Sequence, residues 1–231
     1  MVETPKLVHE VLASDLAVEH VFVRAGSSVG AELDVVCSSL GVPIYSLFAD
    51  TFDKLADAQT PQPAMAVVAA PALDFDHRFS DDPGGLLVLV DVSDPGNVGT
   101  LIRTAEAAGC TGVVVAGETA DVLSPKVVRA SAGSMLRVPL AELDAEWLVT
   151  ALHGAGYDVV ATALHGDHYA DVAATGGVAW LLGSEAHGLR SELATAADRS
   201  VSIPMAGAVE SLNVATAGAV LAFDHAARRR T

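Results

Sequence analysis

The chain has 231 residues, of which 51% are hydrophobic, and its formal net charge is −16. This length and apolar content allow one large domain or two small ones with a well-buried core. The charge excludes a protein that coats nucleic acid through a strongly basic surface, because such proteins neutralise phosphates with clustered lysine and arginine. Any contact with nucleic acid must therefore be local.

The sequence gives no indication of a membrane span, of a secretory signal or of a site built on cysteines. No apolar run approaches the roughly 18 residues that a membrane span needs, and the first residues show no charged start followed by an apolar stretch. The two cysteines, Cys37 and Cys110, lie far apart in the chain, which favours structural thiols over a disulfide or a zinc site. We expect a cytoplasmic protein without a membrane partner or a bound metal.

The first part of the chain alternates helix-like and strand-like segments. Apolar spacing predicts helices at Leu7–Leu12 and around Leu33–Leu40, and strands at Val21–Val23 and Ile44–Tyr45, and a turn at Thr60–Pro63 precedes the segment Ala64–Ala70. The acidic stretch that follows contains proline and glycine and is typical of a linker. We predict a small α/β domain over residues 1–70, a linker over 71–84 and a second domain over 85–231.

In the second domain, uniformly apolar strands alternate with helices. Strands are predicted at Leu86–Val90, Val113–Ala116, Val159–Thr162 and Val178–Leu182, and helices at Val98–Ala108, Trp147–His153 and Ser211–Arg229. This alternation is typical of the α/β class with a mostly parallel sheet that helices cover on both faces. Ligands of such sheets bind beyond the carboxyl ends of the strands.

Three loops that follow apolar strands are candidates for such a site. In the first, Asn97 is a candidate N-cap of the next helix, and Arg103 falls off the apolar stripe of that helix. A solvated arginine is the simpler interpretation of Arg103, although its guanidinium is well suited to holding a phosphate or polarising a hydroxyl.

In the second loop, Gly183 and Gly188 permit a tight turn, and Glu185 would lie where the strand ends. A carboxylate there is more often solvated than catalytic. In the third loop, Ser211 is a natural N-cap of the last helix, and Asn213 has capping chemistry too.

Taken together and in this order, the three loops resemble the three motifs of the SpoU (TrmH-like) family of RNA 2′-O-ribose methyltransferases, of the SPOUT class. The resemblance spans roughly Leu86 to Ala222. Its residues are Asn97, Gly99, Arg103 and Ala105, then Gly183, Glu185, Gly188 and Leu189, then Ile203–Met205 and Ser211–Asn213, with further likeness over Lys126–Ser134.

The resemblance implies a deep C-terminal trefoil knot, S-adenosylmethionine as cofactor and a homodimer in which two subunits form the working site. Carried over by motif position, the cofactor-binding residues are Thr162, Gly183, Ile203, Met205, Leu212 and Asn213. The implied catalytic residues are Arg103, Asn97, Glu185, Ser211 and Asn213, and Arg103 with Arg129 would contact RNA. Arg103 would hold a phosphate or help to remove the hydroxyl proton, although arginine is a reluctant base.

Residues 1–70 resemble the substrate-binding domain of the ribosomal-protein-L30e type that accompanies many members of the family. Family members usually carry a basic segment before the first strand, so we expect this domain to be shortened at its N-terminus. Residues 1–84 hold four basic and thirteen acidic side chains, a net charge of −9 and a poor surface for phosphate.

We expect the substrate to be ribosomal RNA, because an accessory domain can recognise a large folded target by its shape. A transfer-RNA ribose methyltransferase and a non-catalytic knotted protein that binds RNA or cofactor are the alternatives. A nucleotide-binding enzyme is disfavoured, because residues 96–99 fit neither the Gly-x-x-x-x-Gly-Lys phosphate-binding pattern nor the dinucleotide-binding fingerprint. Residues 165–168 contain histidine and aspartate, but such loops are more often ordinary than metal-binding.

Overall fold

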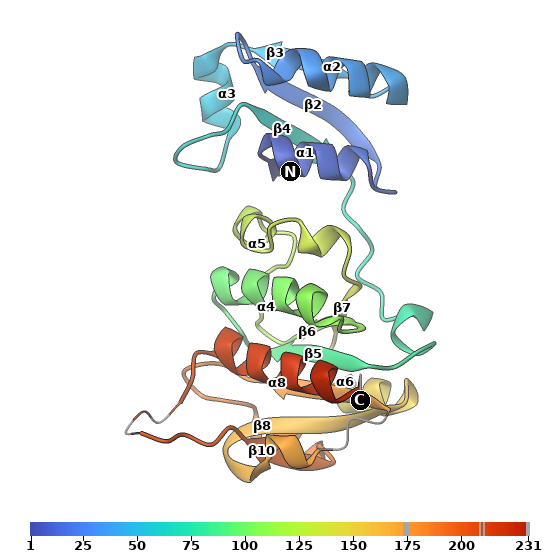
Figure 1. The fold of residues 1–231 in the computed structure, drawn as a ribbon, viewed down its shortest axis with the longest axis vertical. Coiled ribbons are helices and arrows are strands. Elements are labelled where there is room, and N and C mark those ends of the chain that lie inside the picture. Colours follow the sequence, from blue (N-terminus) through green and yellow to red (C-terminus); the bar gives the residue numbers. More distant parts are fainter. Residues whose placement is uncertain (173–175, 208, 210, 230–231) are drawn as a thin grey trace. The chain divides into compact units, whose positions relative to one another are not determined.

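The computed structural model describes residues 1–231 except 173–175, 208, 210 and 230–231. The chain divides into two compact units, Met1–Pro71 and Ala72–Thr231 (Figure 1).

The N-terminal unit is built on a mixed four-stranded sheet in the order β1-β4-β2-β3. Its strands are β1 (Val2–Glu3), β2 (Val18–Arg24), β3 (Ile44–Leu47) and β4 (Ala64–Val68), and its helices are α1 (Pro5–Leu12), α2 (Val29–Leu40) and α3 (Ala49–Leu55). Side chains alternate along β2: Val21 and Val23 are buried, and Val23 lies against Gly30 of α2. Phe22 lies on the opposite face and pairs with Tyr45 of β3.

The second unit is a six-stranded sheet in the order β10-β8-β9-β5-β6-β7, and every pairing described in it is parallel. The strands are β5 (Gly85–Val90), β6 (Gly112–Ala116), β7 (Leu140–Leu143), β8 (Tyr157–His168), β9 (Gly177–Leu182) and β10 (Arg199–Ser202). The helices are α4 (Pro95–Ala108), α5 (Pro125–Ala130), α6 (Leu148–Gly154), α7 (Ser191–Ala196) and α8 (Val214–Arg229). The predicted α/β class with a mostly parallel sheet is confirmed.

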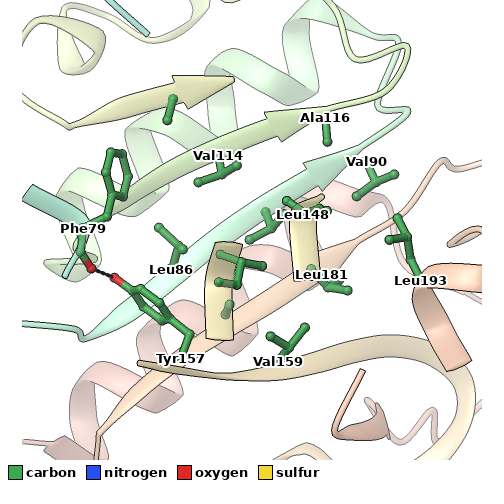
Figure 2. Close-up of a cluster of buried hydrophobic side chains, with 14 residues drawn as sticks. Phe79, Leu86, Val90, Val114, Ala116, Leu148, Tyr157, Val159, Leu181 and Leu193 are labelled. Atoms are coloured by element: carbon green, nitrogen blue, oxygen red, sulfur yellow. Dashed lines mark hydrogen bonds between the residues drawn. The ribbon is translucent and has the colours of Figure 1, made fainter. Parts of the chain in front are cut away.

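Both faces of this sheet are covered, which explains the uniformly apolar strands. On one face, Leu86, Val90 and Val114 pack with Leu148 of α6 and Leu193 of α7 in a buried cluster (Figure 2). On the other face, α4 and α8 contact each other and the strands beneath them.

Glycine permits the close approach of the helices on that second face. A Cβ at Gly99 of α4 would lie 2.9 Å from the backbone nitrogen of Ser131, directly after α5, and 2.4 Å from the Cβ of Ala130. A Cβ at Gly218 of α8 would lie 2.3 Å from Cδ2 of Leu101 and 2.9 Å from Cδ1 of Leu182. The close contact at Gly218 is therefore made with side chains, whereas at Gly99 it is made with both a side chain and the backbone.

The segment 71–84, predicted as a linker, contributes to the core of the second unit from Ala72 onward. It contains a 3-10 helix, η1 (His77–Phe79), and Phe79 is fully buried. The Tyr157 hydroxyl donates a hydrogen bond of 2.6 Å to the Phe79 carbonyl (Figure 2). The backbone nitrogen of Glu142 donates to the Leu73 carbonyl at 2.9 Å. One aromatic residue and two carbonyl contacts therefore anchor this polar stretch.

Strand β8 runs well past the segment that its apolar residues predicted, Val159–Thr162. Its last residues are exposed, and its pairing with β10 shifts register, because Ser200 pairs with Ala161 but Val201 pairs with Asp167. A Cβ at Gly166 would lie 2.7 Å from the Ser200 carbonyl oxygen. The intervening residues of β8 therefore leave the ladder beside the carboxyl ends of the strands.

Cys37 is buried and Cys110 is half-buried, and both are free thiols. Burial raises the pKa of Cys110 to about 12, so this thiol is uncharged near neutral pH. Of the helices in the described ranges, none has the length and apolar character that crossing a membrane requires.

His225 of α8 is 2% exposed and meets the indole of Trp180 edge-on, with ring centroids 6.2 Å apart. Burial, followed by the charges of Arg229 and Arg228, lowers its pKa from 6.5 to about 4. The folded protein therefore holds a neutral imidazole, and the unfolded chain binds one more proton between these two pH values.

We predict that the free energy of unfolding falls by up to about 3 kcal/mol as the pH decreases from 6.5 to 4, in addition to any loss from other groups. Urea unfolding at several pH values should show this loss in the wild type and a smaller loss in His225→Leu. Equal pH dependence in the two proteins would contradict a buried neutral imidazole.

Candidate functional site

The predicted site residues gather where the strands of the parallel sheet end. Strands β5, β6 and β9 end at Val90, Ala116 and Leu182, and each is followed by a loop with polar residues. The segment that enters α8 reaches the same region, because Asn213 hydrogen-bonds to the loop after β9.

The cap of α4 differs from the prediction. The side chain of Asp94, not that of Asn97, caps the helix by accepting from the backbone nitrogen of Asn97 at 3.1 Å. Asn97 lies in the first turn, where its amide side chain is available for a partner outside the helix. Both residue types cap helices well, so the sequence did not distinguish them.

The cap of α8 also differs, because Asn213 caps the helix and Ser211 does not. The side-chain oxygen of Asn213 accepts from the backbone nitrogens of Ala215 at 2.9 Å and Thr216 at 3.2 Å. Ser211 is exposed two residues before this cap.

Three of the predicted catalytic side chains form one hydrogen-bonded cluster. Asn97 Nδ2 donates to Glu185 Oε1 at 2.8 Å, and Asn213 Nδ2 donates to the same oxygen at 2.7 Å. Asn213 Nδ2 also donates to Asn97 Oδ1 at 3.0 Å. The cluster joins the start of α4, the loop after β9 and the start of α8.

The loop that carries Glu185, residues 183–190, folds back on itself. The Gly188 nitrogen donates to the Ser184 carbonyl at 2.7 Å. A Cβ at Gly183 would lie 2.3 Å from the Gly188 carbonyl carbon and from the Leu189 nitrogen. Gly188 has a positive φ of 69°, which favours glycine. Glycine is therefore required where the predicted cofactor loop begins.

The remaining predicted residues lie outside the cluster. Arg103 is exposed on α4 and, within the described part of the chain, has no ion-pair or hydrogen-bond partner. Arg129 is half-buried in the last turn of α5. Thr162 Oγ1 donates to the Leu181 carbonyl at 2.8 Å and so joins the middle of β8 to the end of β9.

The segment between β10 and α8 presents apolar side chains to solvent. Met205 is 38% exposed, Val209 is 62% exposed, and Ile203 and Leu212 are half-buried. An exposed apolar segment beside a polar cluster has the mixed lining that organic ligands require.

Two charged residues of this region, Asp91 and Arg190, are not among those that the sequence motifs predict. Asp91 directly follows β5 and Arg190 ends the 183–190 loop. Arg190 Nε donates to Asp91 Oδ2 and Arg190 Nη2 to Asp91 Oδ1, each at 2.6 Å. Asp91 Oδ1 also accepts from the Glu118 nitrogen at 2.8 Å, in the loop after β6. The residues are 99 positions apart, and no local pattern connects them.

A metal site is not evident at this edge. Within the described ranges, no group of three or more histidine, cysteine or carboxylate side chains is arranged to hold a metal ion, and this includes His165 and His168.

The fold and the cluster define an α/β protein in which three segments bring polar side chains together at one edge of a parallel sheet, the edge where such folds bind ligands. The model of the SpoU rRNA methylase family matches residues 85–223, and the chain belongs to this family. Over 224 residues the chain is 32% identical to the 23S rRNA (guanosine(2553)-2′-O)-methyltransferase RlmP of Bacillus subtilis, a match that covers 96% of this chain and 86% of the relative.

A second relative is the 23S rRNA (uridine(2479)-2′-O)-methyltransferase of Streptomyces viridochromogenes. It is 39% identical over 181 residues, which are 74% of this chain and 62% of the relative.

Solved structures of the family agree over both units of the chain. The SpoU methyltransferase AviRb of Streptomyces viridochromogenes, in complex with AdoMet, has a TM-score of 0.89 at 29% identity and covers 100% of this chain and 90% of its own. The AdoMet-bound rRNA methyltransferase of Sinorhizobium meliloti has a TM-score of 0.86 at 30% identity and covers 99% and 86%.

We predict that Asn213→Ala loses about 1 kcal/mol of unfolding free energy through its missing cap alone. Asn213→Ser retains an oxygen that can cap the helix but lacks the amide that reaches Glu185. Thermal unfolding should therefore show substantial recovery in the serine variant. A serine variant as unstable as the alanine variant would show that the links to Asn97 and Glu185, rather than the cap, stabilise this helix start.

Proposed function

We propose that this protein transfers a methyl group from S-adenosylmethionine to a ribose 2′-hydroxyl of RNA, with 23S ribosomal RNA as the substrate. The observation that carries the proposal is the Asn97–Glu185–Asn213 cluster, in which one residue from each of the three motifs shares hydrogen bonds. The named activities of the two relatives and the AdoMet in the two solved structures support it.

The residues at the edge of the sheet fit this cofactor. The backbone of Gly188 packs directly against Gly183, Gly188 itself is exposed, and Met205 offers an exposed apolar surface for a base. We propose that Thr162, Gly183, Ile203, Met205, Leu212 and Asn213 bind S-adenosylmethionine. When bound, the cofactor supplies an electrophilic methyl group on a sulfonium centre.

Transfer requires that the 2′-oxygen form a bond to the methyl carbon as the bond from that carbon to the sulfur breaks, so that the electron pair stays on the sulfur of the departing thioether, while the hydroxyl proton passes to water. We propose that Arg103 contacts the RNA, where its guanidinium holds a phosphate and stabilises the developing negative charge on the oxygen. Asn97, Glu185 and Asn213 orient the cofactor loop. Glu185 Oε1 accepts from two amide donors, so we propose that the second carboxylate oxygen is the one that takes part in ligand contacts. Ser211 is a further residue of the proposed catalytic site, and Arg129 is a further contact with the RNA.

We also propose that the chain forms a deep trefoil knot and a homodimer, and that it acts in the cytoplasm. The agreement with the AdoMet-bound structures supports the knot. A half-exposed Phe223 on the outer side of α8 supports a partner at this helix. Arg103, which has no ion-pair or hydrogen-bond partner among the described residues, is suited to completing the site of a second subunit.

We propose that the N-terminal unit, an L30e-like domain, binds the RNA substrate by stacking rather than by charge. Its three basic and nine acidic side chains disfavour contacts with phosphate. On the face of β2 and β3 opposite the buried Val21 and Val23, His20, Phe22 and Tyr45 form a ring cluster, and the centroids of Phe22 and Tyr45 lie 5.8 Å apart. Aromatic side chains stack on unpaired bases without needing positive charge.

The first test measures cofactor binding and methyl transfer with one preparation. We predict that calorimetry detects S-adenosylmethionine binding to the wild type and to Arg103→Ala, whereas methyl transfer to an unmodified 23S RNA transcript falls by about 100-fold or more in the variant. Arg78→Ala, which removes an exposed arginine paired with Asp76, is the matched control and should retain both. Failure of the wild type to bind the cofactor would refute the proposed activity.

The second test concerns the ring cluster. Tyr45→Ala should weaken binding of the same transcript by about tenfold, within the range for loss of one stacked base. The slope of affinity against salt concentration should stay unchanged, because no phosphate contact is lost. Val35→Ala, at an exposed position of α2, controls for a general surface effect. Equal affinities in the wild type and Tyr45→Ala would contradict the stacking surface.

A further inference from the structure

The Asp91–Arg190 pair joins three loops at the edge of the sheet where the cluster lies. The two parallel hydrogen bonds give the pair a fixed mutual orientation, because both the guanidinium and the carboxylate are planar. The bond from the Glu118 nitrogen adds the loop after β6 to the loops after β5 and β9. One carboxylate therefore sets the spacing of all three.

The backbone around this pair is unusual. Asp91 has a φ of 56°, in the left-handed region where non-glycine residues are uncommon and aspartate is among the better tolerated. Gly117, with a φ of 65°, lies beneath the pair: a Cβ there would be 2.2 Å from Asp91 Oδ1 and 2.8 Å from Arg190 Nη2. The pair thus occupies the space that a side chain at position 117 would fill.

The 183–190 loop is held at both ends. Gly183 fixes its start by close backbone packing, and Arg190 fixes its end on Asp91. Glu185 lies between these two points and reaches Asn97 and Asn213 through a single oxygen, at 2.8 Å and 2.7 Å. A shift of the loop by one ångström would break at least one of these bonds.

We propose that Asp91 and Arg190 are positioning residues, which hold the 183–190 loop so that Glu185 stays in reach of Asn97 and Asn213 and the loop is preorganised for its ligand. The inference rests on the proposed function for the identity of that ligand, S-adenosylmethionine. Neither residue needs to touch the ligand or the RNA.

The charge state of the pair suits this role. Hydrogen bonding from Arg190 lowers the pKa of Asp91, and the same contact raises the pKa of Arg190. Both groups therefore stay ionised throughout the neutral pH range, and the loop is held independently of pH there.

The chain contains a matched pair for comparison. Arg137 donates to both carboxylate oxygens of Glu106 in the last turns of α4, and its side chain is 45% exposed against 43% for Arg190. Asn97 lies in the first turn of α4 and Glu106 lies near the other end of the helix. Loss of the Glu106–Arg137 pair should therefore affect stability without affecting the cofactor loop.

The experiment compares the full-length wild type with Arg190→Ala, Arg190→Lys, Asp91→Gly and the control Arg137→Ala. Hydrogen exchange of the Gly188 amide, which donates to Ser184 within the loop, reports on loop order without any ligand. Calorimetric titration with S-adenosylmethionine reports on preorganisation.

We expect Arg190→Ala to accelerate hydrogen exchange of the Gly188 amide by about tenfold or more and to weaken the binding of S-adenosylmethionine by a similar factor. Arg190→Lys should recover part of both effects, because it retains the charge but not the planar fork. Asp91→Gly should behave like Arg190→Ala although glycine removes the cost of the left-handed backbone. Arg137→Ala should change neither quantity.

Unchanged Gly188 exchange and cofactor affinity in Arg190→Ala, with only a lower unfolding temperature, would overturn the proposal, because a purely structural pair predicts that result. Should the wild type fail to bind S-adenosylmethionine, the proposed function falls. The exchange measurement would then still confirm or refute the positioning role.

Discussion

One oxygen atom, Oε1 of Glu185, accepts hydrogen bonds from both Asn97 and Asn213, and the orientation of the whole site follows from that sharing. Asn213 must turn its side-chain oxygen toward the free backbone nitrogens at the start of α8. Its amide nitrogen can then face only Glu185 and Asn97. Asn97 must in turn present its oxygen to Asn213 and its nitrogen to the carboxylate. A helix cap therefore determines the orientation of two amides that come from distant parts of the chain.

This arrangement depends on a sheet whose strands all run in one direction. Parallel pairing brings the ends of β5, β6 and β9 to the same edge, and the two covered faces leave that edge as the place where loops can meet. The apolar cluster under α6 and α7 (Figure 2) and the close contacts of α4 with α5 at Gly99 hold the strands and helices from which the loops extend. The polar site is small, and the apolar layers around it position its residues.

Much of this architecture could be predicted from local patterns. Uniform apolar runs identified β5, β6 and β9, and the polar loops after β5 and β9, with the segment before α8, marked the edge that carries the site. Short strands were missed: β10 contains Arg199 and two serines, and β7 contains Glu142, so neither has an apolar run. Phe79 was assigned to a linker because its neighbours are polar, although its own ring is fully buried.

The sequence motifs predicted which residues gather at the site. They did not predict which of two chemically similar residues caps each helix, because tertiary contacts decide that. Asp94 and Asn97 have similar capping chemistry, as do Ser211 and Asn213. Only the folded structure shows that Asp94 and Asn213 are the caps, and that Glu185 engages Asn97 and Asn213. The Asp91–Arg190 pair had no signal at all, since an aspartate after a strand and an arginine before a helix are each common and solvated in most proteins. Such pairs become visible only when the fold has brought the loops together.

Gly183 also limits how this site can change over evolutionary time. Because backbone atoms of Gly188 and Leu189 occupy the space where its side chain would be, every substitution at this position displaces the loop rather than altering the surface presented to a ligand. Diversification can therefore proceed only at neighbouring positions whose side chains are exposed, such as Ala186 and His187 in the same loop and Met205 beyond β10. New specificities would arise around an unchanging backbone turn, so the invariant and the variable parts of the loop are separated by only two or three residues.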